Sequence, residues 1–109
     1  MCTVTLIPTK DNSFILTSNR DEAIARKTLP PEFYQVDKTR MLFPKDAVAG
    51  GTWIGLSDKS TMICLLNGGF ETHKRKAVYR QSRGVVVKDL LGADYLDQAI
   101  KKYDCIGIE

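Results

Sequence analysis

Residues 2–22 read CTVTLIPTKDNSFILTSNRDE, and this stretch decides how the rest of the sequence is interpreted. It contains two runs rich in β-branched and apolar side chains, CTVTLI at 2–7 and SFILTS at 13–18. The residues between the runs include proline, lysine, aspartate and asparagine, which favour a tight turn. Two β-prone runs joined by a short turn predict an antiparallel β-hairpin.

The register of this hairpin gives the first indication of function. If the turn is centred at or just before Asp11, antiparallel pairing places Cys2 opposite Asn19 or Arg20. The cysteine that follows the initiator methionine then lies beside the polar segment NRDE at 19–22. We therefore expect Cys2 and NRDE to share one site at the open end of the hairpin.

A second hairpin is predicted from TWIGLS at 52–57 and STMICLLN at 60–67, which two residues separate. A two-residue turn places Gly50 opposite Asn67, so the segments AGG and NGG meet at the open end of this hairpin. Glycines at strand ends allow a ligand or another stretch of backbone to approach closely.

Residues 23–49 carry three of the four prolines and show no sustained hydrophobic period. So long an irregular connection in a compact domain is usually functional or mobile. We expect a loop that crosses the open ends of both hairpins, with at most a short strand at RMLF (40–43).

Two helices are predicted near the end of the chain. Ser82 can cap a helix that Gly92 ends, although the three consecutive valines in this segment leave a strand as the alternative. A second helix is indicated by apolar side chains at helical spacing, with acidic residues at its start and lysines at its end. CIGI at 105–108 predicts the beginning of another strand. The apolar positions of the second helix are Leu96, Ala99, Ile100 and Tyr103.

The composition restricts the classes of function. A chain of 109 residues with 43 % hydrophobic content forms about one domain. A net charge of +3 does not indicate a nucleic-acid partner, and no apolar run is long enough to span a membrane. No signal peptide is recognisable, so we expect a cytoplasmic protein. Cys64 and Cys105 read as small core residues in no zinc-binding pattern, and we expect reduced thiols, no metal and no cofactor.

Cys2 is the candidate nucleophile. A side chain this small usually permits removal of Met1, which makes Cys2 the N-terminus. Its α-amine then lies within reach of its own thiol and can act as the base, which is how N-terminal nucleophile hydrolases work. The alternative is that Cys2 is a small apolar residue at the start of an edge strand.

Other polar residues near the two hairpin ends complete the candidate site. Asp21 can orient the α-amine, Arg20 can stabilise a thiolate or a substrate carboxylate, and the Asn67 amide can donate to an oxyanion. The alternatives are a solvated turn for NRDE, turn chemistry for the glycines and a core position for Trp53. We predict as catalytic Cys2, Arg20, Asp21 and Asn67, and as ligand-binding Asn19, Gly51, Trp53 and Gly68.

Several segments together resemble a known family. MCTVTLIP, ILTSNRDE, FPKDAVAGGTWIGLS, LLNGGFE and SRGVVVKDLL resemble the NRDE family, the transport-and-Golgi-organisation type proteins. This family is similar to N-terminal nucleophile hydrolases of the choloylglycine hydrolase type. The resemblance implies an α+β fold of antiparallel β-hairpins with helices, the N-terminal part of a layered αββα structure. It also implies Cys2 as the nucleophile, Asp21 beside its amine and Asn67 in the oxyanion hole.

The resemblance leaves two functions open. One is hydrolysis of the C–N amide bond of a small acyl amide. The alternative is a non-enzymatic binding or trafficking protein for an apolar anionic ligand such as haem, an acyl chain or another lipid. We also expect residues 1–109 to be the N-terminal portion of a single NRDE-type domain, incomplete by itself, which self-associates through open strand edges.

Overall fold

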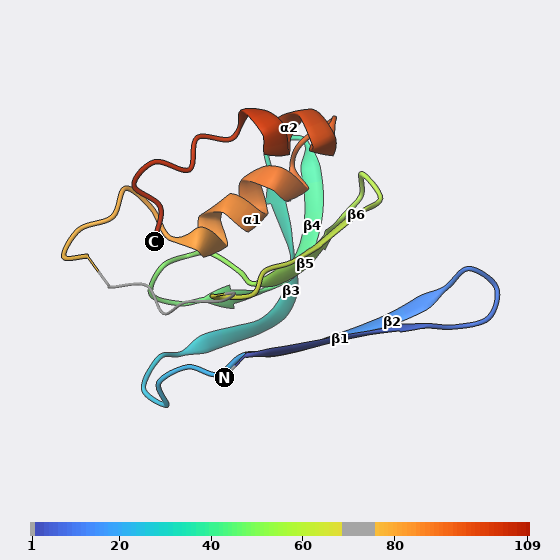
Figure 1. Cartoon of the computed structure of the whole chain (residues 1–109), viewed down its shortest axis with the longest axis horizontal. Helices are drawn as coiled ribbons and strands as arrows, with labels where there is room; N and C mark the ends of the chain where they lie inside the picture. The colour runs from blue at the N-terminus through green and yellow to red at the C-terminus, as the bar shows by residue number, and fades with distance from the viewer. Residues whose placement is uncertain (1, 69–75) are drawn as a thin grey trace.

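Antiparallel strands in two sheets and two helices give this chain an α+β structure, seen in a computed structural model that describes residues 2–68 and 76–109 (Figure 1). The first sheet pairs β1 (Thr3–Pro8) with β2 (Phe14–Asn19). The second has the strand order β3-β4-β5-β6. Its strands are β3 (Thr28–Val36), β4 (Thr39–Asp46), β5 (Ile54–Ser57) and β6 (Thr61–Cys64), and the helices are α1 (Arg83–Leu91) and α2 (Leu96–Lys102).

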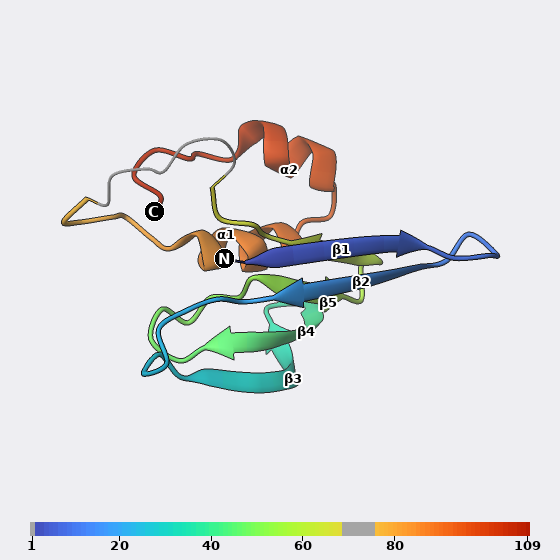
Figure 2. The ribbon, with the colours of Figure 1, turned by 60° about the horizontal axis from the view of Figure 1, so that its bottom comes forward.

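The first hairpin is confirmed. Pairing ends at Thr3 and Asn19, so the next position places Cys2 opposite Arg20, as the turn segment predicts. Asp11 in the turn has a φ of 66°, a left-handed conformation that aspartate tolerates better than most residues. The hairpin extends away from the rest of the chain, with its turn at the far end and its open end next to the second sheet (Figures 1 and 2).

The register of the β5–β6 hairpin differs by one residue from the predicted register. The turn spans three residues, 58–60, because Ser60 adopts a left-handed conformation with a φ of 55°. Continued beyond the strands, this register places Gly51 rather than Gly50 opposite Asn67. Gly51 and Asn67 still meet at the open end of this hairpin, where they line one pocket.

The prediction of an irregular loop over residues 23–49 is wrong. Most of this segment forms the β3–β4 hairpin, and RMLF lies within β4. Pro30 and Pro31 are accommodated because β3 is an edge strand and its register shifts between Leu29 and Glu32. A proline has no N–H to donate, and an irregularity on an edge strand is where the loss costs least.

The core lies between the second sheet and α1. Met41 and Phe43 from β4 pack with Val87 and Leu91 from α1, and each is at most 2 % exposed. Gly55 in β5 leaves room for the Leu91 side chain, since an added Cβ would lie 2.7 Å from its Cδ1 atom. These contacts hold the middle and the end of α1 against the second sheet. The partly buried side chains around the core are Tyr34, Val36, Ile63 and Leu65.

Both predicted helices are confirmed. Ser82 occupies the N-cap position of α1 and Gly92 its C-cap, so the three valines are helical. In α2, Asp97 lies in the first turn and two lysines in the last, as the helix dipole favours. Among the described residues, no helix is long and apolar enough to cross a membrane.

The strand predicted at CIGI is wrong. Gly107 has a φ of 73° and the Ile108 N–H bonds to the Cys105 carbonyl, so this segment turns. Ile108 forms only an isolated parallel bridge, with Gln81. Cys105 is exposed rather than in the core, and Cys64 is partly buried.

Candidate active site

The sulfur of Cys2 contacts the backbone of Asp21. The Asp21 N–H donates to Cys2 Sγ at 3.4 Å, and the thiol lies 3.8 Å from the Asp21 carbonyl oxygen. The hairpin register produces this contact because it places Cys2 opposite the residue that precedes Asp21. A backbone N–H directed at the sulfur stabilises negative charge on it, which is what a nucleophilic thiolate needs.

Most of the residues predicted from the sequence line one small pocket. Six of the eight predicted site residues line it, and they come from the open ends of the β1–β2 and β5–β6 hairpins. Gly51 lines the adjoining pocket, which shares the Trp53 and Asn67 side of the first. Gly68 lines neither pocket. Its φ is 69°, and an added Cβ would meet no other atom within 4 Å. The residues that line the first pocket are Cys2, Ser18, Asn19, Arg20, Asp21, Glu22, Trp53, Leu65 and Asn67.

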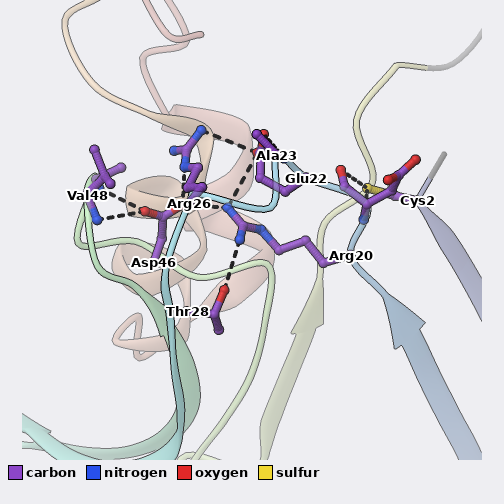
Figure 3. Close-up of polar contacts among 10 residues, drawn as sticks. Cys2, Arg20, Glu22, Ala23, Arg26, Thr28, Asp46 and Val48 are labelled. Carbon is purple, nitrogen blue, oxygen red and sulfur yellow. Dashed lines mark hydrogen bonds and ion pairs between the residues drawn. The ribbon is translucent and has the colours of Figure 1, made fainter.

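The Arg20 guanidinium is bound on several sides. Its Nη1 donates to Thr28 Oγ1 at 3.0 Å, and its Nη2 lies 2.5 Å from Asp46 Oδ2 and 3.4 Å from Glu22 Oε2. The guanidinium also lies over the Trp53 ring, 4.8 Å from its centroid. Figure 3 shows the Arg20 side chain extending toward Thr28 and Asp46, away from Cys2. These contacts link the end of the first hairpin to the second sheet.

Asp46 is the buried partner of this arginine, and it is only 5 % exposed. Its Oδ1 accepts the N–H groups of Val48 and Ala49 at 2.9 and 3.0 Å, while Oδ2 also lies 2.8 Å from Arg26 Nε. Burial by itself would raise the pKa of Asp46. The two backbone donors and the two guanidinium charges outweigh burial and hold the pKa below its ordinary value.

Asp46 and Arg26 are site residues that were not predicted from the sequence. Arg26 also pairs with Glu22 at 3.3 Å, so the cluster contains two guanidinium groups and two carboxylates. A signal for Asp46 was present in the pattern DAVAGG at 46–51, where an aspartate precedes a glycine-rich turn and can accept its backbone N–H groups. No local pattern indicated the role of Arg26.

Gly51 is placed by packing against α1. The Thr52 N–H donates to the Gly84 carbonyl at 3.0 Å, which brings the two segments together. A Cβ on Gly51 would lie 2.5 Å from the carbonyl carbon of Gly84, so a side chain cannot be accommodated there. The predicted ligand-binding role of Gly51 stays a prediction, whereas its close approach to the helix is a feature of the fold.

Trp53, Leu65 and Asn67 bring the open end of the β5–β6 hairpin to the pocket that contains Cys2. The Leu65 N–H donates to the Trp53 carbonyl at 2.7 Å, which extends the β5–β6 pairing beyond the strands. Asn67 follows two residues later and its side chain is exposed. Its amide is therefore accessible at the pocket, and its role as an oxyanion donor stays a prediction.

The family model described as Transport and Golgi organisation 2 matches residues 1–105. The chain belongs to the Transport and Golgi organisation 2 family. The matched range includes every candidate site residue of this family member. No curated protein and no solved structure matches the chain.

Proposed function

We propose that this member of the Transport and Golgi organisation 2 family carries an N-terminal cysteine site that acts on the C–N amide bond of a small acyl amide. The observation that supports it is the contact between Cys2 Sγ and the Asp21 N–H, in a pocket that Trp53 and Asn67 also line. The proposal includes the likeness to N-terminal nucleophile hydrolases and their layered αββα fold.

The proposed reaction has two steps. The Cys2 sulfur adds to the amide carbonyl carbon, the α-amine of Cys2 takes the thiol proton, and that proton then leaves with the amine product. Water hydrolyses the resulting thioester, which releases the acid and regenerates the thiol. Asp21 orients the α-amine, and the Asn67 amide stabilises the oxyanion.

The mechanism requires a free α-amine on Cys2, and therefore the removal of Met1, which lies outside the described residues. A thiol nucleophile must also remain reduced. The cytoplasm is a compartment in which thiols stay reduced, so the proposal includes a cytoplasmic location.

The experiment first determines whether Met1 is removed and then tests whether the Cys2 thiol is acylated. Intact mass of the chain purified from cells reports whether Met1 is removed. The chain is then incubated briefly with p-nitrophenyl butyrate and quenched in acid before the thioester hydrolyses, and peptide mapping locates the acyl group. Because Cys105 is exposed, the parent for this test carries Cys64→Ala and Cys105→Ala. We expect one acyl group, on Cys2, and none on the matched Cys2→Ala variant. A retained Met1, or a Cys2 that does not acylate, contradicts the proposal.

A second function is favoured by one observation. The apolar side chains of Trp53 and Leu65 line the same pocket as Cys2, and an apolar lining is suited to an acyl chain or a haem ring. As a binding protein, the chain would bind haem or a fatty acid without chemistry at Cys2. Binding of either ligand that is unchanged in Cys2→Ala, together with no acylation of the parent, would favour this alternative.

A further inference from the structure

The end of the first hairpin has few means of holding its position. The strands β1 and β2 pack mainly on each other, and several of their apolar side chains are half exposed or more. The hairpin extends from the second sheet (Figures 1 and 2). Cys2 immediately precedes β1 and therefore lies at the open end of the hairpin. The place of Cys2 relative to Trp53 and Asn67 therefore depends on the contacts that residues 19–22 make with the second sheet.

From these contacts we infer that Asp46 is a positioning residue for Cys2. Asp46 holds Arg20, and the peptide bond that joins Arg20 to Asp21 carries the N–H that donates to the Cys2 sulfur. The consequence for catalysis rests on the proposed function, whereas the positioning itself does not. Arg20 acts in the same way, through its contacts with the second sheet rather than on the reacting atoms.

The contacts of Arg20 support this role. Both terminal nitrogens donate to protein groups, Nη1 to Thr28 and Nη2 to Asp46 and Glu22, and one face of the guanidinium lies over Trp53. An arginine that is bound on two edges and one face has a fixed position. Because its side chain extends away from Cys2 (Figure 3), the part of Arg20 that serves the sulfur is its backbone.

Asp46 is itself fixed to the second sheet. It ends β4, and its Oδ1 is held by the N–H groups of Val48 and Ala49, so Oδ2 faces the arginines from a rigid turn. Two guanidinium groups and two carboxylates balance the charge of the cluster. The charged hydrogen bonds of this balanced cluster hold Arg20 in one position on the second sheet.

The test uses Asp46→Asn, because asparagine keeps an oxygen for Val48 and Ala49 and replaces the oxygen that binds the arginines. Trp53 is the only tryptophan, so its fluorescence reports whether Arg20 remains over the ring. We expect a changed Trp53 emission and at least tenfold faster hydrogen exchange at the Asp21 amide. In the Cys64→Ala and Cys105→Ala parent, alkylation of Cys2 by iodoacetamide falls at least threefold.

The matched control is Asp94→Asn, which removes a carboxylate from an ion pair with Lys59 in another part of the structure. We expect this variant to leave three quantities unchanged: the Trp53 emission, hydrogen exchange at the Asp21 amide and the rate at which iodoacetamide alkylates Cys2. Arg20→Met has the effects of Asp46→Asn, and the double variant shows no further loss, since both act through one contact. Arg20→Met also provides the test if Asp46→Asn does not fold.

Two results would overturn the inference. One is a folded Asp46→Asn or Arg20→Met variant with the parental Trp53 emission and Asp21 exchange. The other is an additive loss in the double variant. If Cys2 of the parent does not react, the proposed function fails, but Trp53 emission and Asp21 exchange still decide whether Asp46 positions this end of the hairpin.

Discussion

Gly51 and Gly84 contact each other through backbone alone. A Cβ on Gly51 would lie 2.5 Å from the Gly84 carbonyl carbon, and one on Gly84 would lie 2.9 Å from the Thr52 nitrogen. Since the atoms that would clash are backbone atoms, neither segment can yield without moving its element. The contact therefore sets the distance between the β4–β5 connection and the first turn of α1, and both line the pocket next to the one that contains Cys2.

This contact predicts that Gly51→Ala lowers the free energy of unfolding by about 3 kcal/mol, the upper range for overpacking a tight contact. Urea unfolding followed by circular dichroism measures the change. The matched control is Gly68→Ala, where an added Cβ meets nothing within 4 Å and only the positive φ is unfavourable. That variant loses about 1 kcal/mol. Equal losses in the two variants would show that the contact with Gly84 does not determine the effect.

The parts of the fold that could be predicted depend on local signals. The first hairpin was predictable because two β-prone runs flank a turn-rich segment, and both helices because their caps and apolar spacing lie within ten or so residues. The β3–β4 hairpin was not predictable in this way. Pro30 and Pro31 are signals for a loop, and only pairing with β4 shows that they lie at an irregularity of an edge strand.

The register of β5 and β6 shows a different limit. A sequence does not state whether a turn has two or three residues when no glycine marks it, and here Ser60 takes the left-handed conformation. The gathering of Cys2 with NRDE was predictable because one hairpin produces it. The pairing of Arg20 with Asp46 was not, because Asp46 ends a strand of the hairpin that the sequence analysis missed.

The low pKa of Asp46 predicts how the stability of the chain depends on pH. A carboxyl group whose folded-state pKa lies below the ordinary value of about 3.9 stabilises the fold above that value, and the contribution is lost as the pH falls through the folded-state pKa. At pH 7, Asp46→Asn lowers the free energy of unfolding by about 2 kcal/mol, because charged hydrogen bonds are lost. We expect the difference between wild type and variant to be constant from pH 7 to 5 and to shrink below about pH 4.

Urea unfolding of both proteins at several pH values measures this difference. The comparison cancels the carboxyl groups outside the cluster, and Glu22→Gln in both backgrounds accounts for the carboxylate that shares Arg20 and Arg26 with Asp46. A difference that grows as the pH falls would contradict the direction of the Asp46 pKa shift. A constant difference down to pH 2 would show that the lost stability is unrelated to the charge of Asp46.

The exposed apolar surface of the first hairpin leads to the last prediction, that two copies of the chain associate. Within the described residues, β1 and β2 form a two-stranded sheet, so each has an edge without a neighbouring strand. An open edge with apolar faces tends to pair with another strand, and a second copy supplies an identical edge for a symmetric contact. The exposed apolar side chains are Leu6, Ile7, Phe14 and Ile15, with exposed fractions of 60, 50, 52 and 53 %.

Light scattering on the purified chain measures the association, and we expect a mass of at least two copies at concentrations of tens of micromolar. The variant is Ile7→Lys with Ile15→Glu, because these residues lie directly opposite each other and an opposite-charge pair preserves the hairpin. It removes apolar surface and places charges at the interface, so it is monomeric. Ile106→Glu, which replaces another exposed isoleucine outside the hairpin, remains associated. A parent chain that is a monodisperse monomer, or an association that Ile7→Lys with Ile15→Glu leaves intact, would show that the hairpin does not bind a second copy.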